Sequence, residues 1–255
     1  MHTLSLKEYV WGLTLLNKEL YVLCHGRTDN QVQVHVTTDY ALLRRLSVPG
    51  LHRHDEQDMV SCQRNNCLYI SDSGSKCIHR VPAVNGSVSK WKIPHEPCGL
   101  SVTPGGEVLV VCRGEPDRIV ELTLDGGGKL RMRQIQLQPD IFGPCQAVRL
   151  TTGHFVVCQH GQSGLCEVDP EGKVVQAYGG VGQSRLRCPC HVTVDRNSEF
   201  VFVADHDNHR VVLLTSSLQF LCDVIEVALP NRLYLDHLTR RLYVGHGCDV
   251  TVVQL

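Results

Sequence analysis

Six positions, each near the start of a short β-rich segment, hold the residues that first suggest chemistry. They are Trp11, Asp58, Cys98, Cys145, Cys190 and Asn231. Thiolates bind zinc well, but a tetrahedral zinc site needs sulfur atoms within about 4 Å of one another, at a metal–sulfur distance of about 2.3 Å. The three cysteines come from separate segments whose strands should diverge. We therefore expect small packing residues there and no metal site.

Basic and imidazole side chains form a second candidate set, because they gather in the polar loops that follow or precede strand-like segments. The candidate binding residues are Arg27, Lys76, Arg113, His160, Arg185, Arg187, His191, His206, His209 and His246. The planar guanidinium group is suited to carboxylate and phosphate recognition. Arg185 and Arg187 should point the same way, since side chains alternate along an extended segment.

The loop DHDNHR (205–210) contains residues that are better suited to building a turn than to recognition. Asp and Asn side chains often bond to the backbone of their own turn. Asp205 and Asn208 should therefore hold this loop together, and Arg210 should pair with a neighbouring carboxylate.

The elements that must position these residues form a repeat that runs the length of the chain. Six segments rich in β-branched and aromatic residues recur every 40 to 48 residues. They are ELYVLC (19–24), CLYISD (67–72), EVLVVC (107–112), HFVVCQ (154–159), FVFVAD (200–205) and RLYVGH (241–246). Each is bounded by turn-forming residues, which is typical of a β-strand.

Further strand-like segments flank each repeated segment, one before it, often opened by proline, and two after it. Four short strands per repeat of this length are typical of a propeller blade. The sequence therefore predicts one all-β domain over 1–255, a six-bladed β-propeller of four-stranded antiparallel blades. The last repeat ends after its third strand, so TLSL (3–6) should complete the last blade and remove an exposed edge.

The fifth repeat, YGGVGQSRLRCPCHVTVDRNSEFVFVADHDNHRVVLL (178–214), resembles the NHL repeat. A weaker copy lies at 68–81, and only these two repeats carry the strand-end aspartate, as Asp72 and Asp205. The resemblance implies a six-bladed propeller similar to the C-terminal domain of tripartite-motif ubiquitin ligases, which binds proteins or RNA. A fold does not by itself fix a function.

Composition favours a protein partner over a nucleic acid. The formal net charge is −1, so the charge balance indicates neither RNA nor an acidic membrane as a partner. Aromatic residues make up 5% of the chain, whereas recognition of single-stranded RNA uses aromatic stacking. We therefore expect a non-catalytic platform that binds a protein or peptide, as the substrate-recruiting domain of a larger ubiquitin-ligase-like protein. RNA binding is the first alternative.

A metal-dependent enzyme of the lactonase or lyase type is the second alternative, because such propellers also have six blades. Lactonase-type propellers hold calcium in the central channel with carboxylates and amides, as a hard cation requires. In a propeller, the six positions listed first would line the central channel, and we call them the channel positions. They offer only two oxygen donors, Asp58 and Asn231, which makes a poor calcium cage. The sequence also lacks the G-x-S-x-G, P-loop and H-E-x-x-H motifs. We expect no catalysis and no small-molecule cofactor.

The 13 cysteines are odd in number, and Cys24, Cys112 and Cys158 lie inside apolar runs. Buried reduced thiols explain these positions without disulfides. The first residues, MHTLSLKEYV, have no basic segment followed by an apolar one, and no apolar stretch approaches about 18 residues. We therefore expect a cytoplasmic protein without membrane association.

Overall fold

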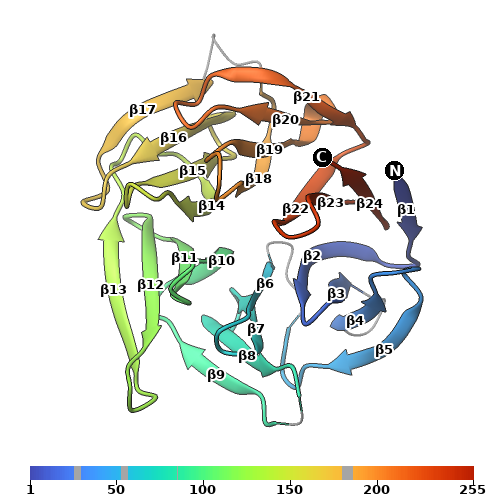
Figure 1. Ribbon diagram of the computed structural model, residues 1–255. Coiled ribbons are helices and arrows are strands. Elements are labelled where there is room, and N and C mark those ends of the chain that lie inside the picture. Colours follow the sequence, from blue (N-terminus) through green and yellow to red (C-terminus); the bar gives the residue numbers. More distant parts are fainter. Residues whose placement is uncertain (26–29, 53–56, 85, 180–185) are drawn as a thin grey trace.

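The computed structural model describes residues 1–25, 30–52, 57–84, 86–179 and 186–255, which contain 24 β-strands in six four-stranded sheets. Figure 1 shows the sheets arranged as blades around a central axis. Neighbouring strands within each sheet run antiparallel. These observations confirm the predicted six-bladed propeller. The described residues include one helix, the short 3-10 turn η1 (His206–Asn208).

The strands of the first three blades follow the chain in order. Blade one contains β2 (Tyr9–Leu16), β3 (Glu19–His25), β4 (Asn30–Val36) and β5 (Leu42–Ser47). Blade two contains β6 (Met59–Cys62), β7 (Cys67–Asp72), β8 (Cys77–Pro82) and β9 (Ser89–Lys92). Blade three contains β10 (Glu96–Val102), β11 (Val108–Arg113), β12 (Arg118–Leu124) and β13 (Leu130–Gln136).

The other three blades repeat this order, except that the last also uses the first strand of the chain. Blade four contains β14 (Pro144–Arg149), β15 (Phe155–Gln159), β16 (Gly164–Val168) and β17 (Val174–Gly179). Blade five contains β18 (Pro189–Val194), β19 (Val201–Asp205), β20 (Arg210–Leu214) and β21 (Phe220–Glu226). Blade six contains β22 (Pro230–Asp236), β23 (Arg241–His246), β24 (Asp249–Gln254) and β1 (His2–Ser5).

The ring closes through β1, which pairs antiparallel with β24 and places His2 opposite Val252. The two chain ends lie side by side in blade six (Figure 1). Leu4 of β1 packs against the cluster that contains Val10 of blade one and Tyr243 of blade six. The predicted completion of the last blade by an N-terminal strand is therefore confirmed.

The hydrophobic core lies between neighbouring blades. One cluster, for example, joins Leu109 and Ile119 of blade three to Phe155 and Val157 of blade four. The second strand of a blade is covered on both faces, so β7 and β15 are buried along their whole length. Strands buried on both faces are continuous hydrophobic runs, which is why these strands were the clearest repeat in the sequence.

A β-bulge near the start of the first strand orients the channel position in five of the six blades. The register shifts fall at Trp11, Cys98, Cys145, Cys190 and Asn231. A bulge leaves one residue out of the ladder and redirects its side chain. In blade two, Asp58 lies just before β6, and its carbonyl accepts a hydrogen bond from the Ser71 amide at 3.0 Å.

Each of the 13 cysteines is a free thiol. Across the ranges described above, no helix is long and apolar enough to cross a membrane.

Candidate functional site

The six channel positions named from the sequence all line one cavity, which we call the upper cavity. It has a volume of about 220 Å³. Its lining consists of Tyr9, Trp11, Asp58, Cys98, Gly99, Arg113, Cys145, His160, Cys190, His191, His206, Asn231 and Arg232. The starts of the first strands and the loops after the second strands therefore meet there.

The three channel cysteines act as links between backbone segments. Cys98 Sγ donates to the Val111 carbonyl at 3.2 Å, and Cys190 Sγ donates to the Pro230 carbonyl of the next blade at 3.2 Å. Burial raises the pKa of Cys98 and of Cys190. Both thiols therefore stay protonated at neutral pH, which fits the predicted packing role.

A buried carboxylate lies at the floor of the upper cavity. Asp58 Oδ2 accepts the Leu100 amide at 2.8 Å, and Oδ1 accepts its neighbour's amide, Met59 N, also at 2.8 Å. Arg232 Nε lies 3.6 Å from Oδ1. Burial acts to raise the pKa of Asp58, but the nearby His191, Arg232 and the amide hydrogen bond outweigh it, and the pKa is lowered. The carboxylate is therefore ionised at neutral pH.

Two polar side chains from blades four and five complete this cluster. Gln146 Nε2 lies 3.3 Å from Asp58 Oδ2 and 3.1 Å from His191 Nε2. His191 Nε2 lies 3.7 Å from the same carboxylate oxygen. Within the described residues, His191 Nδ1 is buried and has no hydrogen-bond partner. His191 lines both cavities of the channel, so this cluster lies between them.

Two further histidines at the wall of the upper cavity each have a side-chain partner. His206 Nδ1 lies 2.7 Å from Asp207 Oδ1, and the hydrogen bond with His206 is the main reason that the pKa of Asp207 is lowered. His160 Nε2 lies 3.4 Å from Cys188 Sγ. A carboxylate on Nδ1 fixes the orientation of an imidazole and leaves Nε2 as the nitrogen for proton transfer.

Aromatic rings and guanidinium groups form the rest of the wall. The Arg232 guanidinium lies over the Trp11 ring, 5.7 Å from its centroid, and Tyr9 packs against Trp11 at a centroid distance of 5.3 Å. Arg232 donates to the carbonyls of Trp11, Asn231 and Gln57. These bonds hold a fixed positive charge beside the cavity.

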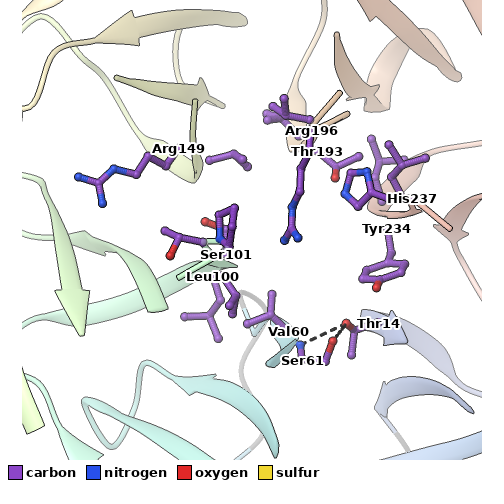
Figure 2. A pocket seen from close by; sticks show the side chains of 18 of the residues that line it. Thr14, Val60, Ser61, Leu100, Ser101, Arg149, Thr193, Arg196, Tyr234 and His237 are labelled. Carbon is purple, nitrogen blue, oxygen red and sulfur yellow. Dashed lines mark hydrogen bonds between the residues drawn. The ribbon is translucent and has the colours of Figure 1, made fainter. Parts of the chain in front are cut away.

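A second cavity of about 410 Å³, the lower cavity, occupies the other end of the channel. Figure 2 shows hydroxyl groups, two arginines and His237 around it. Several of these groups are already used in the scaffold. Ser61 Oγ donates to the Leu15 carbonyl at 2.6 Å, and Ser101 Oγ donates to the Ala147 carbonyl at 2.7 Å. The upper cavity, whose wall includes His206 with its Asp207 contact, is the candidate site.

The structure brings four of the ten candidate binding residues to the upper cavity. They are Arg113, His160, His191 and His206. Their role in binding stays a prediction.

Four other candidates lie away from the cavity. Lys76 is exposed, with Nζ 3.4 Å from Glu96 Oε1, and His246 Nε2 lies 2.8 Å from Thr251 Oγ1. His209 and Arg187 are exposed and do not line it. Arg27 and Arg185 fall outside the described residues.

Turn residues of blade five have the structural roles that the sequence predicted. Asp205 Oδ2 accepts from Asn208 Nδ2 and from Arg210 Nε, both at 2.8 Å. Arg210 also pairs with Asp223 at 3.0 Å.

Sequence reasoning missed Gln146 and Arg232. Gln146, His191 and Arg232 each stand directly after a channel position, two residues after a proline. A comparison of this second position across the repeats would have shown the three polar residues. Nothing in the sequence indicated that they converge on Asp58.

The channel residues do not fit a calcium ion. Calcium takes about six to eight oxygen ligands, whereas the Asp58 oxygens already accept hydrogen bonds and have the Arg232 guanidinium 3.6 Å away. Asn231 Nδ2 donates to the Val10 carbonyl, and among the described residues its buried Oδ1 has no hydrogen-bond partner. One amide oxygen and one saturated carboxylate beside a cation still fall far short of the ligands that calcium takes.

No protein family and no curated protein matches the sequence. Solved structures do match, and the likeness at this level of identity shows the fold. A putative gluconolactonase is 13% identical with a TM-score of 0.73, over 99% of this chain and 91% of that chain. A catalytically inactive histidine-to-alanine variant of virginiamycin B lyase from Staphylococcus aureus was solved with quinupristin. It is 13% identical with a TM-score of 0.68, over 95% of this chain and 80% of that chain. Streptogramin B lyase is 11% identical with a TM-score of 0.68, over 100% of this chain and 86% of that chain.

These matches correct two predictions. The prediction of a non-catalytic platform is wrong, because the solved propellers that this chain resembles include lyases and a putative gluconolactonase. The prediction that the domain is not an enzyme is wrong for the same reason, and the lactonase- or lyase-type alternative is better supported. The structures named above are not tripartite-motif propellers, so the NHL resemblance extends to the six-bladed fold and no further.

Proposed function

We propose that this chain is an enzyme that opens a small cyclic ester in the upper cavity, with His206 as the general base. The observation that carries the proposal is the 2.7 Å contact between His206 Nδ1 and Asp207 Oδ1 at the cavity wall. The similarity to a putative gluconolactonase supports the substrate class. The similarity to a lyase whose histidine-to-alanine variant is catalytically inactive supports the use of an imidazole.

In the proposed reaction, His206 Nε2 takes a proton from water, and the water oxygen attacks the ester carbonyl carbon. The ring C–O bond then breaks. The leaving oxygen receives the proton from the His206 imidazolium, which returns the imidazole to its neutral form. The product is an open-chain hydroxy acid. Asp207 stabilises the imidazolium between the two proton transfers.

Positive charge at the cavity supports the same chemistry. Negative charge develops on the carbonyl oxygen during the attack, and fixed cations in a water-poor site stabilise it. Arg113 and Arg232 both line the cavity, and Arg232 is held by three carbonyl groups. We assign the stabilisation of the carbonyl oxygen to these two guanidiniums.

The cavity limits the size of the substrate. Its volume of about 220 Å³ is below the roughly 300–1,000 Å³ that is typical of pockets for drug-sized ligands. The Tyr9 ring at the cavity wall would pack against the ring carbons of the substrate. A five- or six-membered lactone therefore fits better than a large macrocycle.

The test is a panel of small lactones, with ring opening followed by acid release and the product mass measured. Loss of activity by about 10²- to 10⁴-fold is expected for His206→Gln, the usual range for a general base. His209→Gln is the matched control, because His209 is exposed and does not line the cavity. Its activity should equal that of the wild type.

A product that has gained the mass of one water indicates hydrolysis. An unchanged total mass indicates elimination and would overturn the hydrolytic step. The proposal as a whole fails if no lactone is opened, or if His206→Gln is as active as the wild type.

A further inference from the structure

Two blades end their second strand with a buried aspartate, but they surround it with different chemistry. Asp72 ends β7 and pairs in register with Cys77, the first residue of β8. Asp205 ends β19 and pairs in register with Arg210, the first residue of β20. The two carboxylates are therefore equivalent in position, and so are Cys77 and Arg210.

In blade five the carboxylate is neutralised within the protein. Asp205 accepts hydrogen bonds from the Arg187 amide at 2.7 Å and from Asn208 Nδ2 at 2.8 Å. Arg210 Nε completes the set at 2.8 Å. A guanidinium thus balances the buried negative charge.

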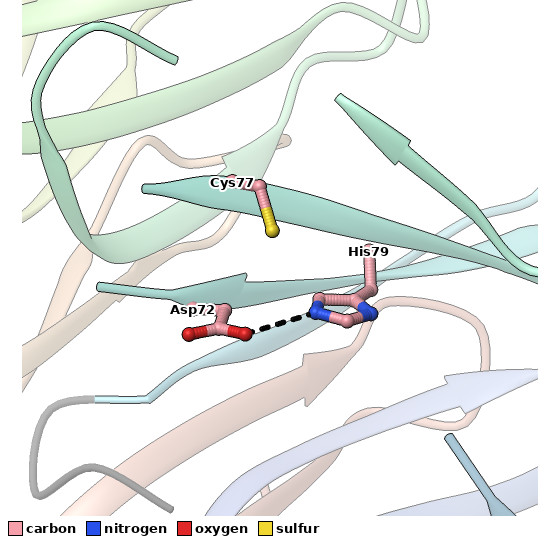
Figure 3. Close-up of side chains that lie close together, drawn as sticks. All are labelled: Asp72, Cys77 and His79. Carbon is pink, nitrogen blue, oxygen red and sulfur yellow. Dashed lines mark hydrogen bonds and ion pairs between the residues drawn. The ribbon is translucent and has the colours of Figure 1, made fainter. Parts of the chain in front are cut away.

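In blade two no guanidinium takes that place, and metal-ligating groups surround the carboxylate instead. One ligand atom each from Asp72, Cys77 and His79 lie within 4.8 Å of one another, and all three residues are buried. Figure 3 shows the three side chains pointing toward a common space, with Asp72 and His79 in contact. His79 Nε2 lies 3.1 Å from Asp72 Oδ2.

A fourth ligand group reaches the same oxygen from the segment that connects blades one and two. His52 Nδ1 lies 3.5 Å from Asp72 Oδ2, and the His52 side chain is 64% exposed. The same nitrogen lies 2.8 Å from Ser75 Oγ, a contact that it would give up on binding a metal ion. Two imidazole nitrogens therefore lie near one carboxylate oxygen, and the Cys77 thiol lies within 4.8 Å of a ligand atom of Asp72. Among the described residues, the Cys77 thiol makes no hydrogen bond that would assign it another role.

We propose that Asp72, Cys77, His79 and His52 bind a zinc ion. One sulfur, two nitrogens and one oxygen are the donors that zinc takes in tetrahedral protein sites. In such a tetrahedron the ligand atoms are about 3.3 to 3.8 Å apart, from metal–ligand distances of about 2.0 to 2.3 Å. The ligand atoms of Asp72, Cys77 and His79 lie within 4.8 Å of one another, so these three close to this value with shifts of about 1 Å. His52 lies outside that group and must turn further toward the other two ligands.

The charges balance in the loaded site. On binding, the Cys77 thiol loses its proton to solvent and forms the sulfur–zinc bond, while the Asp72 carboxylate gives an oxygen–zinc bond. One thiolate and one carboxylate neutralise the divalent ion, so no net charge is buried. His52, at the exposed side, gives the ion its route into the site.

The test uses the whole chain, freed of metal with a chelator and titrated with Co²⁺ as a spectroscopic substitute for zinc. One Co²⁺ per chain with a thiolate-to-cobalt charge-transfer band is expected, and zinc should displace it. Cys77→Ser should abolish the band and weaken binding at least about 100-fold, since loss of even an outer partner costs about 10- to 100-fold. Cys67→Ser is the matched control, because Cys67 is a buried thiol at the other end of β7.

His52→Gln keeps the experiment decisive if Cys77→Ser does not fold, because the His52 side chain is largely exposed. This variant should bind about 10-fold or more weakly. The proposal is overturned if the wild type gives no stoichiometric charge-transfer band, or if Cys77→Ser gives the same band. His206→Gln should bind Co²⁺ normally, so failure of the lactonase proposal leaves this test intact.

Discussion

His191 of blade five and Asp58 of blade two meet in the central channel, with 3.7 Å between Nε2 and Oδ2. Gln146 of blade four and Arg232 of blade six contact the same carboxylate. One buried negative charge therefore holds side chains from three other blades. The channel is a connected polar cluster, surrounded by the apolar layers between the blades.

Replacement of Asp58 by Asn should destabilise the fold by about 3 kcal/mol, because it leaves the buried Arg232 charge without its carboxylate. Urea unfolding measures the loss. Asp39→Asn, at an exposed turn, is the control and should stay within about 0.5 kcal/mol of the wild type. Equal stability of the two variants would show that the cluster does not hold the blades together.

Asp207 is a positioning residue in the proposed reaction, because it acts through His206. Asp207→Asn should lower kcat about 10- to 100-fold and leave KM nearly unchanged, since the lost interaction is with the imidazolium formed during reaction. Asp207→Glu should restore part of kcat. Steady-state kinetics on the best lactone provides the measurement. A change confined to KM would argue for substrate binding instead.

Gly99 should tolerate no side chain. A Cβ built there would lie 2.1 Å from the Cys145 carbonyl oxygen, which is backbone of the neighbouring blade. Gly99→Ala should therefore cost about 3 kcal/mol through forced separation of β10 and β14. Gly126→Ala is the control, because no atom lies within 4 Å of its Cβ. Thermal unfolding of the two variants should differ by many degrees, and matching melting curves would contradict the close approach.

Closure by β1 should contribute measurably to cooperativity. Removal of residues 1–5 leaves unpaired the backbone groups of β24 that face β1, so the melting temperature should fall and the transition should broaden. Leu4→Ser tests packing alone and should cost about 1–2 kcal/mol. Ser5→Ala, at an exposed position, controls for the substitution itself. A truncated chain that melts like the wild type would refute closure.

Buried histidines predict a loss of stability in mild acid. Burial lowers the pKa of His35, of His237 and of His246 below the ordinary value of 6.5. The unfolded chain therefore binds protons first as the pH falls below 6.5, so this stability is fully present above 6.5 and is lost toward the lowered pKa values.

Melting temperatures at about pH 7.5 and about pH 5.5 measure this loss, in a window above the titration of ordinary carboxyl groups. His35→Gln should show a smaller acid loss than the wild type, since Gln can still donate to the Tyr40 carbonyl. An equal acid loss in the two proteins would exclude His35 as a source.

Sequence alone predicted the fold because second strands such as β7 and β15 are buried on both faces, so all but their last residues are largely apolar. The channel positions were also predictable, since each of them except Asp58 is the extra residue of a bulge in its first strand. The convergence of Gln146, His191 and Arg232 on Asp58 could not be predicted from the sequence. It depends on how blades distant in sequence face one another across the ring.

The function was mispredicted for a related reason. Asp205 and Arg210 carry the NHL-like pattern, and the structure shows them closing a turn of their own blade. Such residues stabilise the turn of a blade and do not indicate a function. The proposed ester hydrolysis depends instead on loop residues such as His206 and Asp207. The ligand-like cluster around Asp72 was missed because it depends on the register of β8 against β7, which pairs Cys77 with Asp72, and on the distant His52.

The register of β1 against β24 has a consequence for the order of the chain. With His2 opposite Val252, both ends of the chain leave from the same blade, and blade six is assembled from the two extremes of the sequence. A short peptide joining the ends would let the chain be cut open at any surface loop between blades. Such circular permutants would keep all six sheets, because each blade would still contain the same four strands. The fold should therefore not depend on which blade comes first in the chain.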